Sequence, residues 1–165
     1  MAKKKRKNKG INKILSFIPI VLSIVVIGLM LLDVVKFTGK LLGSEITYSG
    51  FNVIFGLTEK SEVLGATIKT EILGFSILAL IAVILPFVGA CVQMSKNKLV
   101  KLIAFIVTII GAVLIFIMPS FVVFATDVVA STHSVYTASL AVGGIIAGIV
   151  ASIQALVIGY SLLQK

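Results

Sequence analysis

The side chains with the widest range of chemistry in this sequence lie between residues 127 and 134. Asp127, Ser131, His133 and Ser134 together supply a hydroxyl nucleophile, a base and a carboxylate to orient that base, which is the inventory of a hydrolytic triad. A triad also needs oxyanion donors and a pocket that excludes water, and a short external loop offers neither. We therefore expect solvated loop residues here and interpret the chain as a non-enzyme with no catalytic residues.

Metal and cofactor chemistry has few candidate residues in this chain. A structural zinc site needs four ligands and a catalytic one needs three, whereas the chain has one histidine, His133, and one cysteine, Cys91, on a different segment. No glycine-rich phosphate loop follows a predicted strand. The sequence therefore predicts neither a metal site nor a bound cofactor.

The composition of the whole chain is dominated by apolar residues. Hydrophobic residues make up 59% of the chain and charged residues 13%, with a mean hydropathy of +1.19, whereas soluble domains have roughly 45–50% and about 25%. Four long runs contain no Asp, Glu, Lys, Arg or His and cover residues 14–32, 72–94, 102–126 and 138–163. About 20 apolar residues in a helix cross the hydrocarbon of a bilayer. We therefore expect an all-α integral membrane protein, with residues 14–165 forming one left-handed bundle of four transmembrane helices.

The distribution of charge predicts an orientation for these helices. Seven basic residues precede the first run, three lie between the second and third, and Lys165 ends the chain, whereas all six acidic residues lie in the segments 33–71 and 127–137. Because lysine and arginine beside a membrane span stay on the cytoplasmic side, we expect both termini in the cytoplasm. Segments 33–71 and 127–137 are then the outer loops of a multi-pass protein of the cell membrane.

Residues 1–13 are predicted to be an unstructured, basic cytoplasmic tail. Its basic side chains favour contact with anionic lipid headgroups, and the candidates are Lys3, Lys4, Lys5, Arg6, Lys7 and Lys9. No aromatic residue is interleaved among them for stacking on bases, so we do not expect a nucleic-acid partner. The strong excess of lysine over arginine in the whole chain is typical of AT-rich bacterial genomes.

The outer segment 33–71 is too long to be a simple connector and predicts a small strand-like cap. In 45–56, β-favouring residues flank Ser49 and Gly50, which predicts two short strands around a turn, and 59–69 is predicted to prolong the second helix as a polar turn. The aromatic residues are candidates for partner binding: Tyr48, Phe51 and Phe55. Three interpretations stay open for them, namely packing on the chain's own helices, insertion among lipid headgroups and recognition of a partner.

Small residues at a spacing of four in the last run predict close helix packing, because they let two backbones approach in lipid. This set comprises Gly143, Gly144, Ala147, Gly148, Ala151, Ser152, Ala155 and Gly159. Ala104, Thr108 and Ala112 form a matching strip in the third run. The partner of the last helix is then either that strip or a second copy of the chain.

Gln154 is the one amide well inside an apolar run. An amide at such a place is typical of a hydrogen bond between helices. Acidic residues are absent from the runs, which argues against ion coupling through a buried carboxylate.

The order of spans and loops resembles that of claudins and other tetraspan membrane proteins. The motif of claudins, a Gly-Leu-Trp followed by paired cysteines in the first outer loop, is absent, because Thr58 follows Gly56 and Leu57 and the only cysteine is Cys91. The resemblance therefore implies a layout and no specific activity.

These features favour a non-catalytic structural, scaffolding or accessory subunit whose outer segment 33–71 is an interaction surface. The expected partners are the bilayer itself and either another membrane protein or further copies of the chain. The alternative is a small oligomeric channel or transporter that works without a buried coupling carboxylate.

Overall fold

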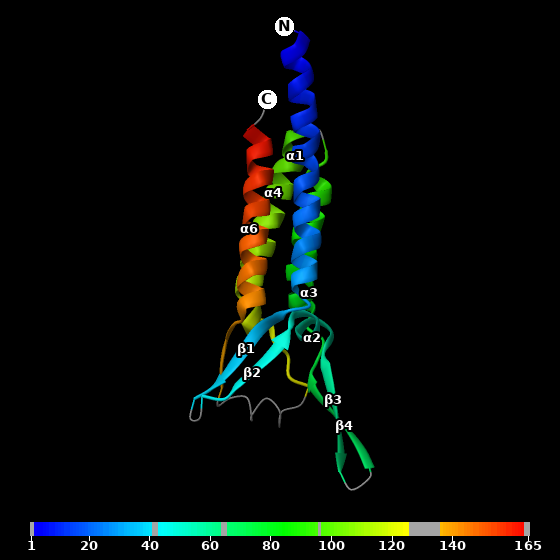
Figure 1. Ribbon diagram of the computed structural model, residues 1–165, viewed down its shortest axis with the longest axis vertical. Helices are drawn as coiled ribbons and strands as arrows, with labels where there is room; N and C mark the ends of the chain where they lie inside the picture. Colours follow the sequence, from blue (N-terminus) through cyan, green and yellow to red (C-terminus); the bar gives the residue numbers. More distant parts are fainter. Residues whose placement is uncertain (1, 41–42, 64–65, 96, 126–135, 164–165) are drawn as a thin grey trace.

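The computed structural model describes residues 2–40, 43–63, 66–95, 97–125 and 136–163. Long helices run side by side along the molecule (Figure 1): α1 (Ala2–Leu29), α3 (Ile77–Val92), α4 (Lys98–Phe116) and α6 (Val142–Leu163). One end carries a cap, which we define as β1 (Asp33–Gly39), β2 (Glu45–Ser49), α2 (Gly50–Phe55), β3 (Leu57–Val63), β4 (Ala66–Leu73), the 3₁₀ turn η1 (Met118–Phe121) and β5 (Tyr136–Leu140). Both termini lie at the opposite end of the helices from the cap.

The prediction of an all-α bundle of four transmembrane helices is wrong. The described residues form five α-helices and two antiparallel sheets, which is a mixed α/β fold. In the part of the chain that the structure describes, α4 and α6 are long and apolar enough to cross a membrane, whereas the apolar helical segment Ser16–Leu29 and the whole of α3 are shorter. The 16 residues of α3 rise only about 24 Å against the roughly 30 Å of hydrocarbon.

The observed helices begin and end at other residues than the apolar runs, because an apolar run does not by itself distinguish strand from helix. Ile72 and Leu73 belong to β4, and residues 138–140 belong to β5. The third helix begins before its run, at Lys98, and ends at Phe116, just ahead of Pro119 in η1. The residues predicted to form an unstructured tail are helical from Ala2 onward.

The three-stranded sheet joins the two outer segments of the chain. Its order is β2-β1-β5, and Phe37 of β1 lies opposite Ile46 of β2 and Ala138 of β5. Val35 and Phe37 are buried on one face, as alternation along a strand requires. On the other face Lys36 forms a 2.8 Å ion pair with Glu45 across the two strands. The second outer segment therefore completes the sheet begun by the first.

The rest of the cap departs from the predicted pair of strands in 45–56. Only Glu45–Ser49 is a strand, because Ser49 then caps a short helix, its hydroxyl accepting from the Asn52 N–H at 3.2 Å. Gly56, with φ of 91°, ends that helix in a conformation that favours glycine. Residues 59–63 and 66–69 lie in the β3–β4 hairpin, which replaces the predicted helical turn.

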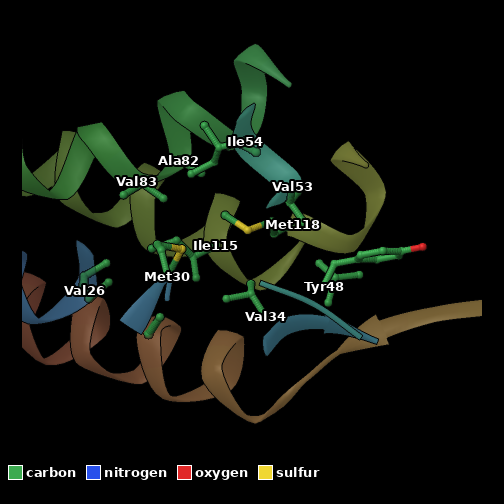
Figure 2. Packing of buried hydrophobic residues seen from close by; sticks show 14 of the residues in the cluster. Val26, Met30, Val34, Tyr48, Val53, Ile54, Ala82, Val83, Ile115 and Met118 are labelled. Carbon is green, nitrogen blue, oxygen red and sulfur yellow. The ribbon is translucent and has the colours of Figure 1, made fainter. Parts of the chain in front are cut away.

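The hydrophobic core lies where the helices meet the cap (Figure 2). Met30 just after α1, Ile115 of α4 and Met118 of η1 are buried there, together with Val34 of β1 and Val53 of α2. Each of these residues comes from a different element. The shared core therefore fixes the cap on the end of the helices.

Candidate functional site: the helix surface, its groove and the cap

The interior between the helices is built from small residues. Of the predicted packing set in α6, Gly143, Gly144, Ala147, Gly148, Ala151 and Ala155 are buried, and Ser152 and Gly159 are partly buried. A Cβ added at Gly144 would lie 2.7 Å from the carbonyl oxygen of Val34, and one at Gly148 would lie 2.6 Å from the Phe116 ring. Helix α6 therefore packs closely on both β1 and α4.

Two of the three residues in the small-residue strip of α4 face α3 and not the predicted α6. A Cβ at Gly89 of α3 would collide with the hydroxyl of Thr108 and would lie 3.0 Å from the Ala104 carbonyl oxygen. Thr108 and Ala104 thus pack against α3, whereas α6 meets α4 at Phe105 and Phe116. Ala112, the third residue of the strip, lies beside α6. Sequence spacing identified the strip, but it carries no information on which helix the strip faces.

The outer surface of the helices carries large apolar side chains. The exposed residues include Phe17 and Ile24 of α1, Ile84 and Phe87 of α3, Ile106 and Ile110 of α4, and Ile146, Ile149 and Ile153 of α6. Ile106, for example, is 48% exposed, whereas Ala104 on the same helix is 0% exposed. Soluble monomers rarely expose contiguous apolar patches of this kind. Small residues inside and large apolar residues outside are typical of helices packed in lipid.

A buried polar junction ties three helices together. The side-chain amide of Gln154 on α6 donates to the Pro86 carbonyl of α3 at 2.6 Å, and the Ser23 hydroxyl of α1 lies 3.3 Å from the same oxygen and 2.8 Å from the Pro19 carbonyl oxygen. The Gln154 Oε1 atom is buried and has no hydrogen-bond partner among the described residues. The amide that the sequence singled out therefore links helices, and its partner is a backbone group that no sequence pattern marks.

A groove of about 290 Å³ opens on the outer side of α4 and α6. Helix α4 contributes Phe105, Ile109, Ala112, Val113 and Phe116, and helix α6 contributes Ser152, Ala155 and Leu156. The Ser152 hydroxyl already donates to the Gly148 carbonyl at 2.8 Å. The lining therefore offers an apolar ligand contact area but no unsatisfied polar group.

The three aromatic candidates of the cap lie in different environments. Tyr48 is only 4% exposed and meets the Phe37 ring edge-on, with ring centroids 5.7 Å apart. Phe51 is half-buried and stacks on Phe55 at 6.0 Å, and Phe55 is 60% exposed. Tyr48 is thus a core residue, and Phe55 keeps the exposure that partner binding requires.

Burial raises the pKa of the Tyr48 hydroxyl, with smaller contributions in the same direction from the charge of Glu59 and from Tyr136. The folded state therefore favours the neutral phenol. This contribution to stability is complete below pH ~10, the ordinary tyrosine pKa, and is lost as the pH rises through the higher folded-state pKa.

We expect Tyr48→Phe to make the free energy of unfolding less sensitive to pH above 10, because the variant has no phenol to ionise at this position. Thermal melting between pH 8 and 11.5 measures the effect. Tyr160→Phe, at a residue 56% exposed on α6, controls for the loss of an accessible phenol. An alkaline decline of equal slope in wild type and Tyr48→Phe contradicts the expectation.

The remaining candidates lie at the ends of the helices or outside the described chain. Lys3, Lys4, Lys5, Arg6, Lys7 and Lys9 lie along the N-terminal turns of α1, at the end of the molecule opposite the cap. Residues 127–134, with the triad inventory, fall outside the described residues. Within the described residues, no group of three histidine, cysteine or acidic side chains is placed to hold a metal ion.

Comparison of the chain with protein-family models, with curated proteins and with solved structures finds no match.

Proposed function

We propose that this chain is a multi-pass membrane protein that acts without catalysis as a structural, scaffolding or accessory subunit, with the outer segment 33–71 as its interaction surface. The observation that carries the proposal is the burial pattern of the helices, which is the reverse of that in a soluble protein. Small residues such as Ala104 and Gly148 are buried between the helices, and large apolar residues such as Ile106 and Ile149 are exposed on the outside. Helices α4 and α6 cross the bilayer. The shorter apolar helices α1 and α3 pack beside them.

The charge distribution supports an orientation with both termini in the cytoplasm and the cap outside. The basic residues of α1 and the connection between α3 and α4 lie at the end of the molecule that holds the termini. Acidic Asp33, Glu45, Glu59 and Glu71 belong to the cap. Basic residues resist translocation across the membrane, so the end with the termini stays inside.

The β3–β4 hairpin is the part of the cap best suited to contact a partner. It extends away from the helices and from the three-stranded sheet (Figure 1). Apart from a bridge between Leu73 and Phe124 at its base, neither strand pairs with a third strand in the described part of the chain. Two-stranded hairpins are marginal alone, and exposed strand edges are sites where another chain adds a strand.

The charges on the hairpin indicate the chemistry of that partner. Lys60 lies directly opposite Lys69, and both side chains are exposed. Like charges opposite one another destabilise a strand pair, so an acidic group supplied by a partner stabilises the hairpin. The partner is therefore expected to place acidic groups against this lysine pair and basic groups against Glu59 and Glu71, which lie on the same hairpin.

A double variant, Lys60→Gln with Lys69→Gln, tests this function. Removing both charges relieves the repulsion within the hairpin, so weaker association does not reflect unfolding. The tagged full chain is purified from its native membranes in mild detergent, and we expect a stoichiometric membrane partner whose recovery falls at least roughly fivefold in the variant, because each rim charge contributes about 1 kcal/mol. The matched control is Lys98→Gln with Lys101→Gln, which removes the same charge from the first turn of α4, away from the hairpin.

Equal recovery of the partner by wild type and Lys60→Gln/Lys69→Gln contradicts the assignment of the hairpin. Absence of any stoichiometric partner contradicts the accessory role. Ion or solute flux through the purified protein in liposomes would instead support the alternative function, a small channel or transporter.

A further inference from the structure

The groove between α4 and α6 is bordered by two aromatic rings. Phe105 packs over Gly159, where an added Cβ would lie 2.9 Å from the ring, and Phe116 packs over Gly148 in the same way. Eleven residues separate the two aromatic positions on α4 and also the two glycines on α6. The groove therefore follows the helix axes for about 16 Å.

The lining of the groove selects an apolar, chain-like occupant. Seven of its eight lining residues are apolar, and the hydroxyl of the eighth, Ser152, is bonded to Gly148 of its own helix. The groove volume of about 290 Å³ is many times the space that one water molecule needs, so a hydrocarbon segment of several carbons fits in it. A second protein chain needs roughly 20–30 residues a side for a stable interface, far more than this groove supplies.

The same face of α4 continues beyond the groove into two lysines. Lys101 and Lys98 precede Phe105 by four and seven residues, the spacing that places side chains on one face of a helix. Lys98 is exposed and Lys101 is half-buried, and neither forms an ion pair within the described residues. They lie about 6 and 10 Å from Phe105 along the axis, beside the positive N-terminal end of α4.

We propose that this surface binds one anionic phospholipid, with an acyl chain in the groove and the phosphate of the headgroup held by Lys98 and Lys101. The proposal rests on the membrane location given above. An apolar groove that leads toward two cations without acidic partners matches an amphiphile with a hydrocarbon tail and a negative head. Such a lipid fastens α4 to α6 on the side where their side chains leave a gap.

Lipid binding to the purified full chain in nonionic detergent tests the site. After removal of native lipid, the protein is titrated with phosphatidylglycerol or with phosphatidylcholine of the same acyl chains, and bound lipids are counted by native mass spectrometry. We expect one tightly bound phosphatidylglycerol. In Lys98→Gln/Lys101→Gln its affinity falls roughly 25-fold, toward that of phosphatidylcholine, because each basic residue near anionic lipid contributes about fivefold. Lys60→Gln/Lys69→Gln, with the same charge change on the hairpin, leaves the affinity unchanged.

Two further variants fill the groove from opposite sides. Ser152→Leu extends a side chain from α6 and Ile109→Trp extends one from α4, and either is expected to abolish tight binding of both lipids. If either variant fails to fold, as judged by thermal melting, the lysine pair and the comparison of the two lipids still decide the question.

The proposal is overturned if phosphatidylcholine binds as tightly as phosphatidylglycerol, if the Lys98/Lys101 variant keeps its affinity, or if both folded groove variants retain the lipid. These results leave membrane insertion of the chain untouched. Failure of the membrane location gives a different result, since the protein then remains soluble and monodisperse after the detergent is removed.

Discussion

Gly144→Leu lowers the free energy of unfolding by about 3 kcal/mol or more, at the upper end of the range for overpacked sites. The added Cβ lies 2.7 Å from the carbonyl oxygen of Val34 and 2.6 Å from a methyl carbon of Leu140. The Val34 oxygen is backbone of the buried strand β1 and accepts the Ala141 N–H at 2.9 Å, so it does not move aside freely. Thermal or denaturant unfolding in detergent measures the loss.

Leucine at two other glycines should change the free energy of unfolding less, because the space around each of these glycines differs. Gly148→Leu meets the ring of Phe116, a side chain that is 40% exposed and therefore has room to move aside, so we expect a loss of about 1 kcal/mol. Gly28→Leu has no neighbour within 4 Å and gains helix propensity, so it is expected to stabilise by up to about 1 kcal/mol. Equal effects at Gly144 and Gly28 show that α6 does not pack on β1 as described.

Gln154→Glu is expected to lower the free energy of unfolding at pH 7 by about 3 kcal/mol, the cost of a charge at the centre of a membrane helix. Gln154 is 0% exposed, and its amide donates to the Pro86 carbonyl oxygen. An ionised glutamate side chain has no N–H or O–H to donate, so its negative oxygen would lie against the Pro86 carbonyl oxygen without a hydrogen bond. The loss shrinks as the pH is lowered, because a protonated carboxyl is uncharged and again donates to Pro86.

Gln154→Met is the matched control for this prediction. It removes one interhelical hydrogen bond, worth about 0.6 kcal/mol in membrane proteins, and also removes the buried Oε1 atom that has no partner. The two effects oppose each other, so stability should change by less than about 1 kcal/mol. A Gln154→Glu variant as stable as Gln154→Met at pH 7 places this residue in contact with water and contradicts the described core.

The apolar runs predicted where long helices would form, but they did not predict where those helices would begin and end. Ile72, Leu73 and residues 138–140 lie in apolar runs that predicted helix, yet they belong to strands β4 and β5. Pairing between segments about a hundred residues apart, such as Phe37 with Ala138, is a long-range property. Local composition does not encode it, and this is why the all-α fold class was wrong.

The candidate residues show the same limit. Spacing singled out Gly144 and Gly148, which are buried, and hydropathy singled out Gln154. The partners of these residues are the backbone of β1, the ring of Phe116 and the carbonyl of Pro86, which have no sequence signature. Lys98 and Lys101, two of the three basic residues between the second and third runs, indicate only an orientation in the sequence, because their alignment with a groove depends on how α4 and α6 pack together.

Thiol labelling of intact cells is the most direct test of the central claim, that the helices lie in lipid with the cap outside and the termini inside. Single cysteines at Thr70 of the hairpin, Asn97 between α3 and α4, and Ile106 on the outer face of α4 are placed in a Cys91→Ser background. A membrane-impermeant reagent is expected to label Thr70→Cys alone. Disrupting the cells with the bilayer intact should expose Asn97→Cys, while Ile106→Cys stays unreactive. Labelling of Ile106→Cys by a water-soluble reagent, or labelling of Asn97→Cys from outside, contradicts this account.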